Sequence, residues 1–235
     1  MKNLRIEAVI VAVGLVLLGW CLYLGLAKFA TGERVVSVRG LAEREVKADY
    51  VIWPVVYKTT GNDLQAIHAE MNRANGVISA FLRRNGVKAD EISVSAPQIV
   101  DLRADRYNAQ AEGVRDRYNV TSVITVASHQ VDRVRSLMSR MGELLREGIA
   151  ISDGGYENRV EYEFTSLNTI KPKMIEEATR NAREAARKFA TDSESELGKI
   201  KKASQGLFSI EPRDQYTPYI KKVRVVTSVD YFLNS

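Results

Sequence analysis

The sequence is poor in the side chains that most often build reactive sites: 235 residues include one cysteine, two histidines and five prolines. The single cysteine, Cys21, lies in an apolar run, so the rest of the chain has no disulfide, thiol nucleophile or thiolate metal ligand. His68 and His129 alone fall short of an ordinary zinc site, which takes four ligands. We interpret both as surface or boundary histidines.

Common catalytic motifs are missing as well. No Gly-x-Ser-x-Gly elbow, phosphate-binding loop or dinucleotide-binding glycine motif occurs. Residues 153–155 (Asp-Gly-Gly) are typical of a turn and lack the regular oxygen ligands of a calcium loop. Glu161 and Glu163 would share a strand face, but Arg159 on the same face favours a solvated row of ion pairs over a catalytic pair. We therefore predict no catalytic, cofactor-binding or metal-binding residue.

Charge of one sign is not concentrated. Lys and Arg number 34 against 29 Asp and Glu, and outside residues 1–31 the balance is 31 against 28, or +3. In the polar stretch 101–116, basic residues alternate with acidic ones, among them Asp101, Asp105 and Asp116. A nucleic-acid-binding protein gathers its basic residues on one face, so we predict no nucleic-acid partner. The three aspartates would bind a cation if their loop folded back, but a solvated loop is favoured.

One long apolar run lies near the start of the sequence. Residues 8–27 carry no charge, and 11 of these 20 residues are Val, Ile or Leu. A helix of that length is about 30 Å long and matches the hydrocarbon core of a bilayer. The aliphatic side chains favour insertion by roughly 3–7 kcal/mol in total. We predict that residues 1–33 form a cytoplasmic stub, a transmembrane anchor over about 8–27 and a short linker.

A cleaved signal peptide is the alternative interpretation of this run. Signal peptides have an apolar core of 7–15 residues and a small-residue cleavage site, which residues 30–32 resemble. The greater length favours a retained anchor, and Trp20 before Cys21 argues against a lipoprotein signal. Basic residues number two on each side, so the orientation rests on the basic start of the chain. We expect a cytoplasmic N-terminus and a periplasmic or extracellular domain over residues 34–235.

Within residues 34–235 the hydrophobic pattern alternates between periods of two and of three to four residues. We predict three helices, which begin at Asn62 (with Gln65 completing a capping box), at a Ser128 cap and at Pro172. They end near Gly86, Gly148 and Leu197. Predicted strands cover 35–38 (ending at Gly40), 50–58 (with Pro54 at an edge or bulge), 92–100, 117–126, 159–166, 206–210 and 223–232.

Paired strands followed by helices indicate an α+β fold: an N-terminal transmembrane helix, then an antiparallel sheet packed with three main helices. Each helix has a predicted buried stripe. In the long helix the stripe is made of alanines at every fourth position, and we expect it to pack on the sheet rather than on another subunit. The three stripes are Leu64, Ile67, Met71, Ala74, Ile78 and Phe81; Val131, Val134, Met138, Met141 and Leu145; and Ala178, Ala182, Ala186 and Ala190.

Four segments together resemble the bacterial SIMPL-domain family, over nearly all of residues 34–233. They are 36–40 (Val-Ser-Val-Arg-Gly) followed by Asp49, 82–87 (Leu-Arg-Arg-Asn-Gly-Val) running to Glu91-Ile92, 118–120 (Tyr-Asn-Val), and the alanine-stepped helix ending at Leu197-Gly198. Ala48 departs from the pattern, since many members have a proline there. The resemblance implies a periplasmic or surface domain loosely linked to envelope and oxidative-stress phenotypes, with ring-like homo-oligomers in some members and no catalytic residues.

Three functions remain open at this stage. The leading one is a membrane-anchored, non-enzymatic envelope domain that acts by self-association, as a homo-oligomer, or by partner binding, with stress protection as one role. The second is a hydrolase with a carboxylate-based site in residues 101–116. The third is a carrier of a small apolar ligand held between sheet and helices, for which an enclosed apolar cavity would be needed.

Overall fold

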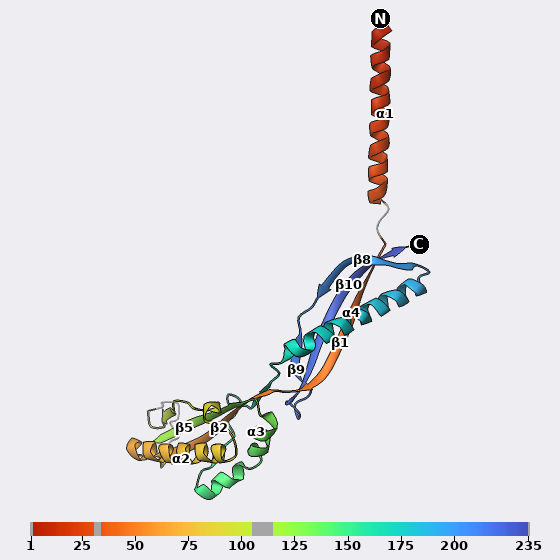
Figure 1. The fold of residues 1–235 in the computed structure, drawn as a ribbon. Coiled ribbons are helices and arrows are strands. Elements are labelled where there is room, and N and C mark those ends of the chain that lie inside the picture. Colours follow the sequence, from red (N-terminus) through yellow and green to blue (C-terminus); the bar gives the residue numbers. More distant parts are fainter. Residues whose placement is uncertain (1, 31–33, 105–114, 235) are drawn as a thin grey trace. The chain divides into compact units, whose positions relative to one another are not determined.

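The computed structural model describes residues 2–30, 34–104 and 115–234, and its fold is α+β with antiparallel strand pairs (Figure 1). Residues 34–234 divide between two compact units, and their strands form two sheets. Unit 1 comprises 1–42, 173–207 and 225–235, and unit 2 comprises 43–172 and 208–224. The predicted fold class is confirmed, since three main helices follow the N-terminal apolar helix: α2, α3 and α4.

Helix α1 (Lys2–Ala30) contains the predicted span. Its Ala8–Gly25 segment has a mean hydropathy of 2.4, and none of it is buried. Among the described helices, this one alone is long and apolar enough to cross a membrane, and a signal sequence would pass the same test. The structure therefore shows an apolar N-terminal helix whose side chains are exposed over Ala8–Gly25.

The first sheet has the strand order β1-β10-β8, with β9 pairing β10. Its strands are β1 (Val35–Lys47), β8 (Glu196–Gln205), β9 (Ser209–Pro212) and β10 (Ile220–Asn234). In unit 1 the alanine face of α4 (Leu167–Asp192) packs on this sheet, as predicted, and all four alanines are at most 2 % exposed. A buried cluster joins helix and strands through Val36, Ala182, Ala186, Val229 and Tyr231.

Strand β1 is longer than predicted because Gly40 does not end it. A Cβ atom at Gly40 would lie 1.8 Å from the Ala178 carbonyl oxygen and 2.4 Å from the Ala182 nitrogen. The glycine is needed for the close approach of α4, and the strand continues through it to Lys47. The sequence predicts a strand end at this glycine, whereas the glycine is needed because a helix about 140 residues further along the chain packs on the strand.

Helix α4 begins and ends about five residues earlier than predicted. Pro172 lies inside the helix, because the start is set by Asp49, whose carboxylate accepts hydrogen bonds from the Thr165 and Ser166 backbone N–H groups at 2.7 and 2.9 Å. A carboxylate there also complements the positive end of the helix dipole. After Asp192, Glu194 turns the chain with φ of +51°, so the helix stops without a glycine and Leu197 belongs to β8.

Unit 2 is built on the second sheet, with the order β3-β5-β2-β6; β4 also pairs β5, and β7 pairs β2. Strand β2 pairs β5 along its whole length. On its other side β7 pairs 50–52 and β6 pairs 56–57, so Pro54 lies at a local edge, as predicted. The strands are β2 (Tyr50–Gly61), β3 (Ile92–Val94), β4 (Gln98–Asp101), β5 (Tyr118–Ser128), β6 (Ile151–Ser152) and β7 (Glu161–Glu163). Strand β7 corresponds to the strand predicted over 159–166 and is shorter than expected.

Helix α2 (Leu64–Arg84) covers this sheet with its predicted stripe, except that Leu64 is exposed. Its N-cap is Asp63, which accepts a hydrogen bond from the Gln65 N–H at 2.8 Å, so the predicted capping box at Asn62 is wrong. The Asn62 side chain instead accepts from the Arg117 N–H at 3.0 Å and ties the start of β5 to the helix. A short 3-10 turn, η1 (Ala89–Glu91), follows the helix and leads into β3.

The second predicted helix is interrupted. It consists of α3 (Val131–Met138) and a 3-10 segment, η3 (Met141–Glu147), which ends at Gly148 with φ of +76°. The changed helical period buries Leu144 and leaves Leu145 63 % exposed, opposite to the prediction. Ser128 is not the N-cap, which is Gln130, although its hydroxyl accepts a hydrogen bond from the Gln130 N–H at 3.0 Å.

Candidate functional site

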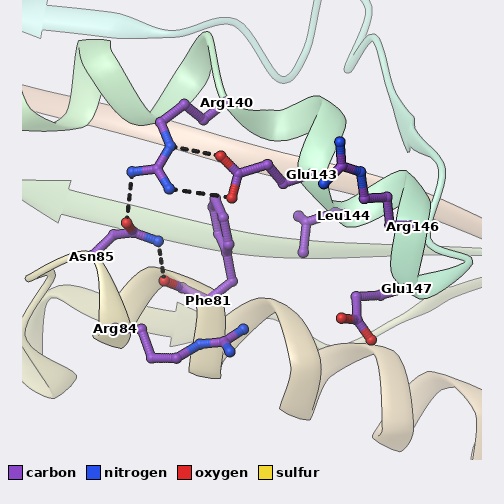
Figure 2. A pocket seen from close by; sticks show the side chains of 8 residues that line it. All are labelled: Phe81, Arg84, Asn85, Arg140, Glu143, Leu144, Arg146 and Glu147. Carbon is purple, nitrogen blue, oxygen red and sulfur yellow. Dashed lines mark hydrogen bonds and ion pairs between the residues drawn. The ribbon is translucent and has the colours of Figure 1, made fainter.

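A pocket of about 370 Å³ opens in unit 2 between the end of α2 and η3 (Figure 2). We call it the arginine pocket, because three of its lining side chains carry guanidinium groups. Its lining residues are Phe81, Arg84, Asn85, Arg140, Glu143, Leu144, Arg146 and Glu147.

The two helix ends place the charged side chains around the pocket. Asn85 caps α2, and its side-chain amide donates to the Phe81 carbonyl oxygen at 2.8 Å. Gly86 follows with φ of +88°, a conformation that glycine adopts without strain, and turns the chain away. Arg84 therefore lies in the last turn of α2, and the last turn of η3 carries Arg146.

Arg140 is held in place on both sides. Its guanidinium donates to both carboxylate oxygens of Glu143, at 2.7 and 3.2 Å, and to the side-chain oxygen of Asn85 at 2.8 Å (Figure 2). The hydrogen bonds from Arg140 hold the pKa of Glu143 below its usual range, and the nearby charges of Arg146 and Arg84 act in the same direction. All three guanidinium groups thus act on one carboxylate.

Arg84 and Arg146 have no hydrogen bond or ion pair with any side chain in the part of the chain that the structure describes. Arg140 and Glu143 satisfy each other, so the remaining charges at the pocket are two guanidinium groups and the Glu147 carboxylate. Guanidinium groups bind carboxylates and phosphates through paired N–H donors. The arrangement is therefore suited to an anionic group of moderate size.

Apolar side chains also reach the pocket. Phe81 and Leu144 line it and are only 3 % and 1 % exposed, since both belong to the core of unit 2. A ligand with an anionic end and a short apolar stem would fit this lining better than a fully solvated ion. The lining is otherwise polar, unlike the enclosed apolar cavity that a carrier of apolar ligands would need.

The two histidines lie in different places and do not meet at this pocket. His68 is on the exposed side of α2, with Asn72 Nδ2 at 3.4 Å from its ring nitrogens. His129 precedes α3, where its Nδ1 lies 2.9 Å from the Asp49 carbonyl oxygen and its ring packs against Tyr50 with centroids 4.8 Å apart. Within the described ranges, no group of three or more His, Cys, Asp or Glu side chains is placed to hold a metal ion.

The aspartates of the 101–116 stretch are engaged where they are described. Asp101 accepts two hydrogen bonds from the Arg117 guanidinium, at 2.8 and 3.0 Å, and these bonds lower its pKa. Asp116 accepts from the Thr60 hydroxyl at 2.6 Å. Asp105 lies outside the described residues, so the predicted alternative site at this stretch is described only in part.

The other acidic candidates are at the surface of unit 2. Glu161 and Glu163 are exposed on β7, and the guanidinium of Arg159 lies 3.9 Å from the centre of the Tyr156 ring. The turn predicted at residues 153–155 begins only at Gly155 and runs to residue 158, and the Asp153 carboxylate accepts from the Gly155 N–H at 3.4 Å.

Sequence reasoning did not identify the arginine pocket. Arg84 appears in the sequence analysis only within the family segment 82–87, and Arg140 and Arg146 lie in the second predicted helix but outside its predicted stripe. The interruption between α3 and η3 turns these side chains toward the end of α2, and no short-range sequence signal predicts that meeting.

Comparison with protein-family models gives a match over residues 36–228, to the family named SIMPL and described as proteins of unknown function (DUF541). A search of functionally curated proteins found no match. The matched range covers the second sheet, the first sheet except the ends of β1 and β10, the helices α2, α3 and α4, and the arginine pocket. It confirms the resemblance drawn from the sequence segments at 36–40, 82–87 and 118–120. The chain belongs to the SIMPL family, whose molecular function is unknown.

Proposed function

We propose that the protein is a non-enzymatic domain, held at a membrane by residues 8–27, that binds an acidic segment of a partner protein in the arginine pocket. The observation that carries this proposal is the pair of guanidinium groups, Arg84 and Arg146, at a pocket that already holds Arg140 in a fixed position.

The nature of the pocket favours a carboxylate on a peptide. A glutamate side chain has a short apolar stem that can lie against Phe81 and Leu144 while its carboxylate reaches a guanidinium group. Hydrogen bonds to charged groups contribute about 1.5–3 kcal/mol when protected from water. At this open pocket we expect roughly 1 kcal/mol for each arginine, because exposed charges are screened.

Membrane attachment is supported by the length, hydropathy and exposure of the Ala8–Gly25 segment. The anchor would keep the domain on the outer side of the membrane if the basic N-terminus stays in the cytoplasm. Extraction of membranes with alkaline carbonate, followed by N-terminal sequencing of the retained protein, tests this part. A mature chain starting at Glu33 would show that the span is a signal sequence.

Binding is tested with the full-length protein in detergent micelles and a tri-glutamate peptide, followed by titration calorimetry. Arg84→Gln combined with Arg146→Gln should weaken binding by about tenfold or more, because two favourable contacts are lost. The control Arg183→Gln with Arg187→Gln removes the same charge from the exposed side of α4 in unit 1. Equal weakening in both double variants would show a general charge effect and contradict the proposal.

The same titration separates the other partners. Tighter binding of inorganic phosphate than of tri-glutamate would indicate a phosphate ligand in place of an acidic peptide. Self-association through the pocket would appear as a loss of oligomer mass in the Arg84/Arg146 variant alone, measured by sedimentation. Either result would replace the acidic partner proposed above.

A further inference from the structure

A second pocket in unit 2, of about 280 Å³, contains a buried lysine. Its lining residues are Tyr162, Glu163, Phe164, Thr165, Ile210 and Lys221, and we call it the lysine pocket. Lys221 lies at the start of β10, where it pairs with Pro212 of β9, and is only 8 % exposed. Lysine is almost never buried without a partner, so this position calls for a physical reason.

The Lys221 amine has no hydrogen bond or ion pair with another residue of the described ranges. Burial lowers its pKa, and the more distant charges of Glu163 and Glu161 oppose that effect without cancelling it. A lysine with a lowered pKa holds more of its amine in the neutral form at neutral pH. By contrast, Lys222 points its amine to Glu43 at 2.7 Å and is more than one third exposed.

The other lining residues favour a neutral ligand over an anionic one. Glu163 brings one carboxylate to the same pocket, and its negative charge disfavours an anionic ligand. Phe164, Ile210 and the Tyr162 ring supply apolar walls. A neutral amine at a pocket with apolar walls and one carboxylate is suited to imine formation with a carbonyl compound.

We propose that the lysine pocket is a carbonyl-capture site, in which Lys221 forms an imine with a short-chain aldehyde whose apolar part lies against Phe164 and Ile210. The site is separate from the arginine pocket and does not depend on the function proposed for it.

The chemistry is balanced without an oxidant or reductant. The lone pair of the Lys221 nitrogen attacks the carbonyl carbon, and the carbonyl oxygen takes up a proton to give a carbinolamine. The nitrogen loses one of its two protons as the carbinolamine forms. It loses the second as the C–OH bond breaks and the C=N bond forms, and that proton leaves with the hydroxyl group as one water molecule. Within this proposal we assign Glu163, the carboxylate that lines the same pocket, to carry the proton from the nitrogen to the departing hydroxyl group.

The experiment uses the full-length protein in detergent micelles, with propanal as the probe and cyanoborohydride to reduce the imine to a stable propyl-amine. Tandem mass spectrometry of peptides from a glutamate-specific protease reads the modification at each lysine over time. At pH 7 we expect Lys221 to be modified about tenfold faster than Lys188, an exposed lysine on α4. A rate at Lys221 equal to or below that at Lys188 would overturn the proposal.

Three variants test the pocket itself. Ile210→Trp fills it and should slow modification at Lys221 severalfold while leaving Lys188 unchanged; an unchanged Lys221 rate would show that the probe enters elsewhere. Glu163→Gln should also slow Lys221, whereas Glu161→Gln removes a charge that does not line the pocket and should not. If Glu163→Gln leaves the Lys221 rate unchanged or accelerates the reaction, Glu163 is not the proton carrier. Circular dichroism confirms that each variant is folded.

Discussion

Replacing Gly40 by alanine gives the most direct test of how α4 is held on the first sheet. The added Cβ would lie 1.8 Å from the Ala178 carbonyl oxygen and 2.4 Å from the Ala182 nitrogen. Both atoms belong to the helix backbone, so no side chain can rotate to make room. The helix has to move away from β1 by more than about 1 Å to restore ordinary contact distances.

The expected cost follows from two opposing effects. Inserting a methyl group into a well-packed interior destabilises a protein by about 1–3 kcal/mol. A gap of 0.5–1 Å along the alanine face also removes about a quarter to a half of the dispersion energy of each atom–atom contact that it opens. Alanine in place of glycine also restricts the unfolded chain, which stabilises by about 0.4–1 kcal/mol. The loss of packing in the folded state is larger than the effect on the unfolded chain, and we expect Gly40→Ala to lower the free energy of unfolding by about 2–4 kcal/mol.

Urea denaturation of the detergent-solubilised full-length protein, followed by far-ultraviolet circular dichroism, measures this change. Gly76→Ala is the matched control, because Gly76 is exposed within α2 and a Cβ there meets nothing within 4 Å. Higher helix propensity should make that variant more stable by about 0.8–1.0 kcal/mol. If Gly40→Ala is as stable as the wild type, α4 does not pack on β1 at the observed distance. Adding Ala178→Gly should give no rescue, since the obstructing atoms are in the backbone.

Three further predictions concern other parts of the fold. Asp49→Asn should destabilise the protein by about 1–2 kcal/mol at pH 7, because the charge at the start of α4 is lost. Burial opposes ionisation of the Asp49 carboxyl, but hydrogen bonds from Ser166 and Thr165 outweigh it, so the pKa of Asp49 is lowered. The wild-type advantage should therefore be present above pH 4 and disappear as the pH falls through the lowered pKa, and an advantage independent of pH would refute this explanation. Phe81→Ala should lower the free energy of unfolding, measured by urea denaturation, by about 3–5 kcal/mol because Phe81 is buried. His68→Ala should lower it far less. Equal losses in the two variants would contradict the assigned buried face of α2. Residues 34–235 without the apolar helix should fold as a soluble domain. Their self-association should be weaker than that of the full-length protein, because the membrane tether raises the effective concentration of the domains. Sedimentation of the truncated and full-length proteins tests this, and equal oligomers in both would show that the tether plays no part.

The sequence best predicts those features of the fold that depend on the residues of a single helix or strand. The stripe of α2 and the alternating face of β5 follow from period alone, and five of the six residues predicted for α2 are buried, as are the inward residues Val120, Ser122, Ile124 and Val126 of β5. The stop at Asn85-Gly86 was also predicted correctly, because a glycine with positive φ is a local requirement.

The errors share one physical cause, which is a partner distant in the sequence. Gly40 was read as a strand end because α4 was not yet known to approach it, and the start of α4 depends on Asp49, more than 110 residues earlier. Leu145 and Leu144 exchanged roles because the core of unit 2 imposes a 3-10 turn after α3. Both pockets combine residues from separate helices or strands. The sequence shows these charged residues, but it does not predict that they lie close together in the fold.

The path of the chain between the two units has a consequence for synthesis on the ribosome. All strands of the second sheet lie between Tyr50 and Glu163, so that sheet can form while the rest of the chain is still being made. The first sheet cannot, since β10, which lies between β1 and β8, is the last of the described strands to be synthesised. Until it emerges, β1 and β8 have unpaired edges, a state prone to aggregation. A nascent chain stalled before Ile220 should thus be the species that most needs a chaperone.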